Sequence, residues 1–137
     1  MSEVSDLSRG LEQVLGPLDV QVGGYRLSHL RQHAAESLTT FAELAYQSLN
    51  NMGVQLPPAV DVFAGEDSLL EIDLRHPDAP LAEAALCNDI ELARRFKEVE
   101  VLHELLRAID GAGDSSPAMH AVFHVGLTSM GPVAFFA

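Results

Sequence analysis

Basic residues are scarce in this chain of 137 residues, which has eight lysines and arginines against 20 aspartates and glutamates and a formal net charge of −12. Only one of the eight, Lys97, is a lysine. Surfaces that bind a nucleic-acid backbone or an anionic membrane are rich in basic side chains. We therefore expect neither nucleic acid nor membrane among the direct partners of this protein.

Cysteine and long apolar runs are also nearly absent. With the single Cys87, the chain can form neither an intramolecular disulfide framework nor a cysteine-rich zinc site. No stretch approaches the ~20 apolar residues that a membrane-spanning helix needs. Residues 1–16 include three acidic side chains, so they differ from the basic and apolar regions of a signal peptide. We therefore expect a cytoplasmic protein in a reducing environment.

The motifs of common catalytic and metal sites are missing too. His103 and Glu104 begin like the zinc-protease HExxH motif, but Arg107 stands where the second histidine is required. Ser129 lacks the preceding glycine of a nucleophile elbow. The acidic residues of 61–78 fail the ligand spacing of an EF-hand loop. The sequence therefore favours a protein that is not an enzyme and holds no cofactor.

Apolar residues make up 47% of the chain and charged residues 20%, a composition typical of a folded protein. The length predicts one domain over residues 1–137. Helical spacing of apolar residues is clearest over 28–52 and 88–110, where Gly53 and Gly111 act as stops and Asn88 is the expected N-cap. In the strand that we expect over 69–74, apolar and polar residues alternate, which should place Leu70, Ile72 and Leu74 on one face of the strand.

These patterns predict an α+β fold in which antiparallel β-hairpins form a sheet packed by two long helices and shorter helices. The expected order is α-ββ-α-ββ-αα-ββ. Its elements are a helix over 1–16, a hairpin over 18–27, a helix over 28–52, strands over 60–63 and 69–74, helices over 80–87 and 88–110, and a C-terminal hairpin over 123–136. For the first arm of that last hairpin, a helix is the alternative.

The negative charge is concentrated in the middle of the chain. Residues 61–110 contain 13 acidic and five basic side chains, a net charge of −8, whereas residues 111–137 contain only one acidic side chain. Such a field would steer association with a basic partner. The residues that we predict to bind a partner are Glu66, Asp67, Glu71 and Asp73 in the acidic part and Phe135 and Phe136 in the apolar tail.

The apolar tail itself has two interpretations. Residues 117–137 contain no charged side chain, and such a segment left in water would expose an unusually apolar patch. We favour a tail that closes the sheet of its own chain. In the alternative, it packs on another subunit or on a partner.

Histidines supply the candidates for a metal site. His29 and His33 are spaced i,i+4 with Glu36 one turn further on, so three ligands for zinc or nickel would share a helical face. A simple solvated helix face explains the same pattern. His120 and His124 form a second pair, but on a strand they would lie about 13 Å apart, too far to bind one ion.

Two other histidines have structural interpretations. His103 lies near the apolar stripe of its helix, which predicts a partly buried side chain that is hydrogen-bonded to a neighbour. His76 precedes Pro77 at the end of a strand, where turn chemistry explains it.

The sequence therefore predicts a non-enzymatic, acidic protein that binds another, basic or partly apolar protein, in the manner of a chaperone, an adaptor or an inhibitor. A homodimer is also compatible with the apolar tail. A small metal-binding protein or metal-dependent enzyme that uses the histidine and glutamate cluster is the alternative function. An acidic mimic of nucleic acid is a further one.

Overall fold

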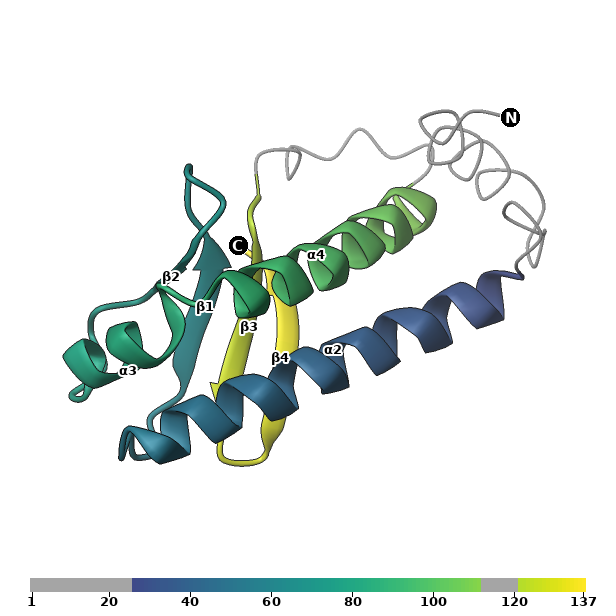
Figure 1. Cartoon of the computed structure of the whole chain (residues 1–137). Coiled ribbons are helices and arrows are strands. Elements are labelled where there is room, and N and C mark those ends of the chain that lie inside the picture. The colour runs from purple at the N-terminus through teal and green to yellow at the C-terminus, as the bar shows by residue number, and fades with distance from the viewer. Residues whose placement is uncertain (1–25, 112–120) are drawn as a thin grey trace.

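The structure, a computed structural model, describes residues 26–111 and 121–137. These residues form three helices and a four-stranded antiparallel sheet, which confirms the predicted α+β class (Figure 1). The elements are α2 (Leu27–Asn51), β1 (Val60–Ala64), β2 (Leu70–Ile72), α3 (Ala79–Leu86), α4 (Ile90–Asp110), β3 (Phe123–Thr128) and β4 (Gly131–Phe136). The predicted helix over 1–16 and nearly all of the predicted hairpin over 18–27 lie outside the described residues.

The two long helices differ from expectation only at their ends. Helix α2 begins at Leu27, which we expected in a strand. The Leu27 side chain is buried in a small apolar cluster with Leu30 of the same helix and Leu105 of α4, and this packing favours the helical position. The N-cap of α4 is Asp89 rather than Asn88, and its carboxylate accepts the backbone N–H of Leu92 at 3.1 Å. Neither difference moves the apolar face of a helix.

The sheet has the strand order β2-β1-β3-β4, and all neighbouring strands are antiparallel. Side chains alternate between its two faces. The inner face is apolar and lies against α2, α3 and α4, which occupy one side of the sheet in Figure 1. No described helix covers the other face. We call it the open face, and its residues are Asp61, Phe63, Glu71, Asp73, His124, Gly126, Val133 and Phe135.

Three phenylalanine rings join the helices to the sheet. Phe96 of α4 contacts Phe41 of α2 with ring centroids 5.4 Å apart, and it contacts Phe123 of β3 at 5.6 Å. All three side chains are fully buried. The contact with Phe41 is edge-to-face and the contact with Phe123 is tilted, and such ring pairs add to the stabilisation that comes from burying each ring. The three rings hold α2 and α4 against the inner face of the sheet and make no contact on the open face.

The C-terminal segment forms the predicted hairpin, and β4 becomes an edge of the sheet. Ser129 and Met130 form the tight turn between β3 and β4, and the Thr128 side chain supports this turn with two hydrogen bonds. At the other edge, β2 ends at Ile72. Leu74 therefore does not share the face of Leu70 and Ile72 as expected, and it is exposed.

The single cysteine ends the short helix α3. Cys87 is half-buried, and this burial, reinforced by nearby Glu83 and Glu71, raises the pKa of its thiol to about 11. A raised pKa stabilises the protonated thiol in the folded state, so this contribution to stability is present below the unfolded-state pKa. It is lost as the pH rises toward about 11.

The thiol of Cys87 should therefore react slowly in the native protein. At pH 8, a pKa two units above normal lowers the thiolate fraction about a hundredfold. Alkylation by iodoacetamide, followed by mass spectrometry, should be slower by about this factor than in denaturant, and it should accelerate as the pH is raised. Equal rates in the two states at pH 8 would contradict the burial of this side chain. No other cysteine contributes to the signal.

Candidate functional site

The open face is built by the register of four strands. One row across the sheet contains Glu71, Phe63, His124 and Phe135, in the order β2, β1, β3, β4. A second row contains Asp73, Asp61, Gly126 and Val133. The β2 side is therefore acidic, the β4 side is apolar, and the two sides meet between β1 and β3.

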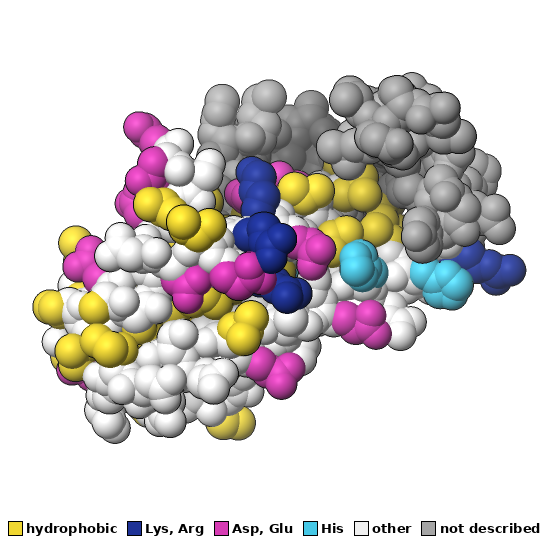
Figure 2. All heavy atoms as spheres, in the orientation of Figure 1, with side chains coloured by type: hydrophobic (Ala, Val, Ile, Leu, Met, Phe, Trp, Pro, Cys, Tyr) yellow, Lys and Arg dark blue, Asp and Glu magenta, His cyan; other side chains and the backbone are white. Residues whose placement is uncertain are grey.

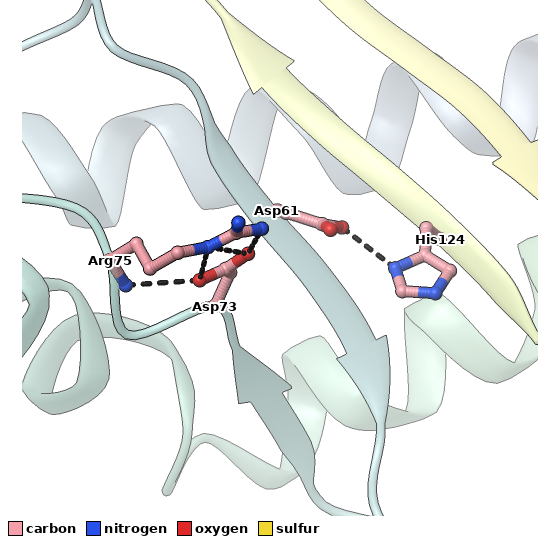
Figure 3. Close-up of polar contacts among 4 residues, drawn as sticks. All are labelled: Asp61, Asp73, Arg75 and His124. Atoms are coloured by element: carbon pink, nitrogen blue, oxygen red, sulfur yellow. Dashed lines mark hydrogen bonds and ion pairs between the residues drawn. The ribbon is translucent and has the colours of Figure 1, made fainter. Parts of the chain in front are cut away.

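Asp61 and His124 meet at this boundary. The Nδ1 of His124 lies 2.9 Å from Oδ1 of Asp61, so an N–H there donates to the carboxylate (Figure 3). The imidazole also lies between two aromatic neighbours, with ring centroids 5.1 Å from both Phe63 and Phe135, and it is stacked on Phe135 at an interplanar angle of 14°. These contacts fix the orientation of the ring. They make His124 a rigid part of the surface.

Asp73 and Arg75 form the polar pair next to it. The Nε of Arg75 donates to both carboxylate oxygens of Asp73 at 2.9 and 3.0 Å, and its backbone N–H donates to Oδ1 at 3.0 Å (Figure 3). These hydrogen bonds lower the pKa of Asp73 to about 2. Asp73 therefore remains ionised across the physiological range. The Arg75 side chain is 90% exposed and is accessible to a partner.

The predicted partner-binding residues separate into three places. Glu71, Asp73 and Phe135 share the open face. The exposed Glu66 and Asp67 lie in the turn between β1 and β2, where the Asp67 carboxylate accepts the backbone N–H of Leu69. Phe136 points to the inner face.

Phe136 is half-buried because its ring has two partners on the inner side of the sheet. It contacts the ring of Phe123 at 5.4 Å, and the guanidinium carbon of Arg107 lies 4.3 Å from its centroid. Neighbouring residues of a strand point to opposite faces, so Phe135 and Phe136 cannot contact one partner surface together.

The candidate metal ligands lie on α2. His29 and His33 are exposed and line a pocket of about 440 Å³ with Leu30 and Leu102. The carboxylate of Glu36 accepts a hydrogen bond from Gln32 at 3.2 Å. Within 26–111 and 121–137, no group of three or more histidine, cysteine, aspartate or glutamate side chains is placed to hold a metal ion.

The second histidine pair is divided between described and undescribed parts of the chain. His120 lies outside the described residues. His124 points to the open face, whereas α2 packs on the inner face, so the structure does not bring His124 to His29 and His33. Its contacts with Asp61 and two aromatic rings are those of a surface residue of the sheet.

A second hollow lies between the β1–β2 turn and the first half of α4. It measures about 620 Å³ and combines apolar walls from Leu69, Ile90 and Phe96 with the cations Arg94 and Lys97. Figure 2 shows this basic cluster over the first half of α4, with acidic side chains beside it. Arg94 is paired with Glu91, and Lys97 with the buried Glu100 at 3.2 Å. The cations are therefore already neutralised within α4.

Sequence reasoning did not assign five residues of the open face to a partner surface: Asp61, Phe63, His124, Gly126 and Val133. Asp61 and His124 are 63 residues apart, and only the pairing of β1 with β3 joins them. Val133, which is 52% exposed, was part of the predicted hairpin but was not recognised as surface. Alternation within each strand was the available signal, but it could not identify which strands are neighbours.

Two further results concern membrane spans and the comparison with known proteins. Among the described helices, none is sufficiently long and apolar to cross a membrane. No protein-family model, no curated protein and no solved structure matches this chain. Its function must therefore be argued from the geometry of its own surface.

Proposed function

We propose that this protein binds another protein through the open face, and that the bound segment carries basic and apolar side chains. The observation that carries the proposal is the position of an acidic and an apolar half side by side on a face that no described helix covers. Binding without catalysis is the work of a chaperone, an adaptor or an inhibitor. The reducing cytoplasm is the compartment that we propose for it.

The apolar half provides the contact area. Val133 is 52% exposed, Phe135 is 36% exposed, and Val122, just before β3, is 44% exposed. Phe63 extends this surface toward the middle of the sheet. Apolar side chains that gather on one face of a soluble protein are typical of an interaction site. A strand-based surface also loses little conformational entropy when it binds.

The acidic half selects for a basic partner and raises its association rate. Asp61, Glu71, Asp73 and Arg75 together carry a net charge of −2, on a chain whose net charge is −12. A basic partner is attracted both by this local charge and by the field of the whole molecule. Electrostatic steering of this kind raises the association rate, and salt screens it.

The decisive variant is Glu71→Lys combined with Asp73→Lys. It reverses the charge of the acidic half without changing a buried side chain, and we expect it to weaken binding of the natural partner by roughly tenfold or more. The partner would be captured from the native host on immobilised protein and identified. Its affinity for the purified variant would then be measured at low and at high salt.

A matched control separates local from overall charge. Glu43→Lys combined with Glu98→Lys changes the net charge by the same amount, on exposed positions of α2 and α4. The control should bind the partner nearly as tightly as the unmodified protein does. Equal affinity of both double variants, or binding that is insensitive to salt, would refute the open face as the binding site.

A further inference from the structure

The backbone of β4 has one bonded side and one free side. Val122 and Ala137 exchange two backbone hydrogen bonds, of 2.7 and 2.9 Å, so they form a hydrogen-bonded pair of the β3–β4 ladder. Such pairs alternate with non-hydrogen-bonded pairs along an antiparallel ladder. Pro132, Ala134 and Phe136 therefore direct their backbone groups away from β3. The proline fits this assignment, because it has no N–H to offer to the ladder.

This free edge has little of the usual protection. Natural edge strands are kept from pairing by being short, by carrying charged side chains or by proline. Of these features β4 has only Pro132, which lies near its start. The other edge of the sheet, β2, is short and charged, since it contains three residues with Glu71 at its centre and is followed directly by Asp73. β4 contains six residues and no charged side chain. Within the described residues, no strand pairs with its free side.

We propose that two copies of the chain pair antiparallel through their β4 strands, about a two-fold axis at Ala134. The two four-stranded sheets then form one continuous sheet. A two-fold interface must be complementary to itself. The hydrogen-bonding groups of β4, its side chains and the distribution of charge each meet this requirement.

The hydrogen bonds close in this register. Ala134 exchanges its N–H and C=O with Ala134 of the second copy. The N–H of Phe136 donates to the C=O of Pro132 in the second copy, and symmetry repeats this bond. Both free N–H groups of each strand thus find an acceptor. Pro132 has no N–H to leave unpaired, and only the carbonyl of Phe136, near the end of the strand, receives no donor from the second copy.

The side chains of the open face also match. The register places Val133 beside Phe135 of the second copy, and symmetry repeats the pair. A β-branched residue beside an aromatic one is a favourable cross-strand pair. Both side chains are partly exposed in the single chain, and in the joined sheet each gains an apolar neighbour at its side while the open face itself stays uncovered. On the inner face, two small Ala134 side chains meet and allow the strands to approach.

The distribution of charge favours the β4–β4 contact over other contacts between two copies. Each chain carries −12, so most surfaces of one copy repel the other. Residues 121–137 carry no charged side chain. Pairing through β4 also puts the acidic β2 strands at the two far ends of the joined sheet. A second copy is therefore the occupant for which this uncharged edge is best suited, because the basic side chains of another partner would find no opposite charge along β4.

The first test is the mass in solution. Light scattering should give twice the 14.8 kDa mass of the chain. Ala134→Pro removes the N–H at the two-fold axis and leaves the β3–β4 ladder intact, so it should give the single-chain mass at the same concentration. Val133→Glu, at an exposed position, should act likewise, and Val122→Glu is the control with the same charge outside β4. Circular dichroism verifies folding.

The second test reads the register. In a Cys87→Ser background, Val133→Cys and Phe135→Cys chains are prepared separately. Non-hydrogen-bonded pairs lie about 4.5 Å apart between Cα atoms, which a disulfide can bridge. Oxidation of the mixed chains should give a cross-linked dimer in much higher yield than oxidation of either chain alone. Equal yields would exclude the register centred on Ala134.

Two outcomes would overturn the dimer itself. The first is a single-chain mass at every protein concentration. The second is a dimer that persists in both Ala134→Pro and Val133→Glu. The Glu71→Lys, Asp73→Lys variant should remain dimeric, because it changes the opposite edge of the sheet. The dimer and the proposed partner binding can therefore fail independently.

Discussion

Replacing Phe96 with alanine is expected to lower the free energy of unfolding by about 3–5 kcal/mol. The side chain is 1% exposed and joins α4 to α2 and β3 through contacts with Phe41 and Phe123. Its removal loses the transfer free energy of a whole ring and leaves a cavity between two layers. The layers cannot close this cavity without moving α4 relative to the sheet.

Urea denaturation followed by circular dichroism measures this loss. Ile90→Ala is the control in the same helix, because its side chain is 75% exposed, and we expect a change within about 0.5 kcal/mol. Phe96→Leu keeps much of the volume and should fall between the two. A loss below about 1 kcal/mol for Phe96→Ala would contradict the central place of this ring in the core.

Replacing His76 with alanine should cost about 2–3 kcal/mol, although it removes no apolar core residue. The side chain is 7% exposed. Its Nε2 lies 3.0 Å from the carbonyl oxygens of both Gln55 and Pro58, and its Nδ1 accepts the backbone N–H of Asp78 at 2.8 Å. The ring is thus the neutral tautomer with hydrogen on Nε2, and it joins two distant loops.

The cost arises because backbone groups lose their partner. Alanine at position 76 leaves the N–H of Asp78 and two carbonyls without the hydrogen bonds that the imidazole supplied. Asp78 also accepts the backbone N–H of Gln55 at 3.0 Å, so the two loops would separate together. Thermal and urea unfolding would measure the effect.

The control for this prediction is His33→Ala, at an exposed position of α2. It should leave the stability within about 0.5 kcal/mol of the unmodified protein. If His76→Ala were as stable as this control, water would have to replace the imidazole fully, and the loop connection would have no structural role. The sequence interpretation of His76 as turn chemistry identified its place at a turn and missed the bonds to residues near position 57.

Helices and strands were predictable where local periodicity is strong. The apolar stripe from Leu30 to Leu49 indicated α2, and the alternation through Val125 indicated a strand rather than a helix for the last segment. Exact ends were not predictable, because both Asn88 and Asp89 are suitable caps. Only the path of the preceding chain selects the second of them.

The partly buried histidine of α4 shows how far local reasoning extends. His103 was predicted to bond a neighbour, and its Nδ1–H donates to the carbonyl of Val99 at 2.9 Å. Its ring also packs on Phe123 of β3, with centroids 5.0 Å apart. The hydrogen bond lies one helical turn away and follows from sequence, whereas the ring contact needs the packing of a helix on a sheet.

By itself, the sequence determined the α+β class, the negative charge and its concentration in residues 61–110, because these depend on composition and on patterns within a few residues. The tertiary structure decided which residues share a surface. It joined Asp61 to His124, separated Phe135 from Phe136, and left the uncharged strand β4 at an edge. Those outcomes depend on strand order and register, which arise from contacts between segments far apart in the chain.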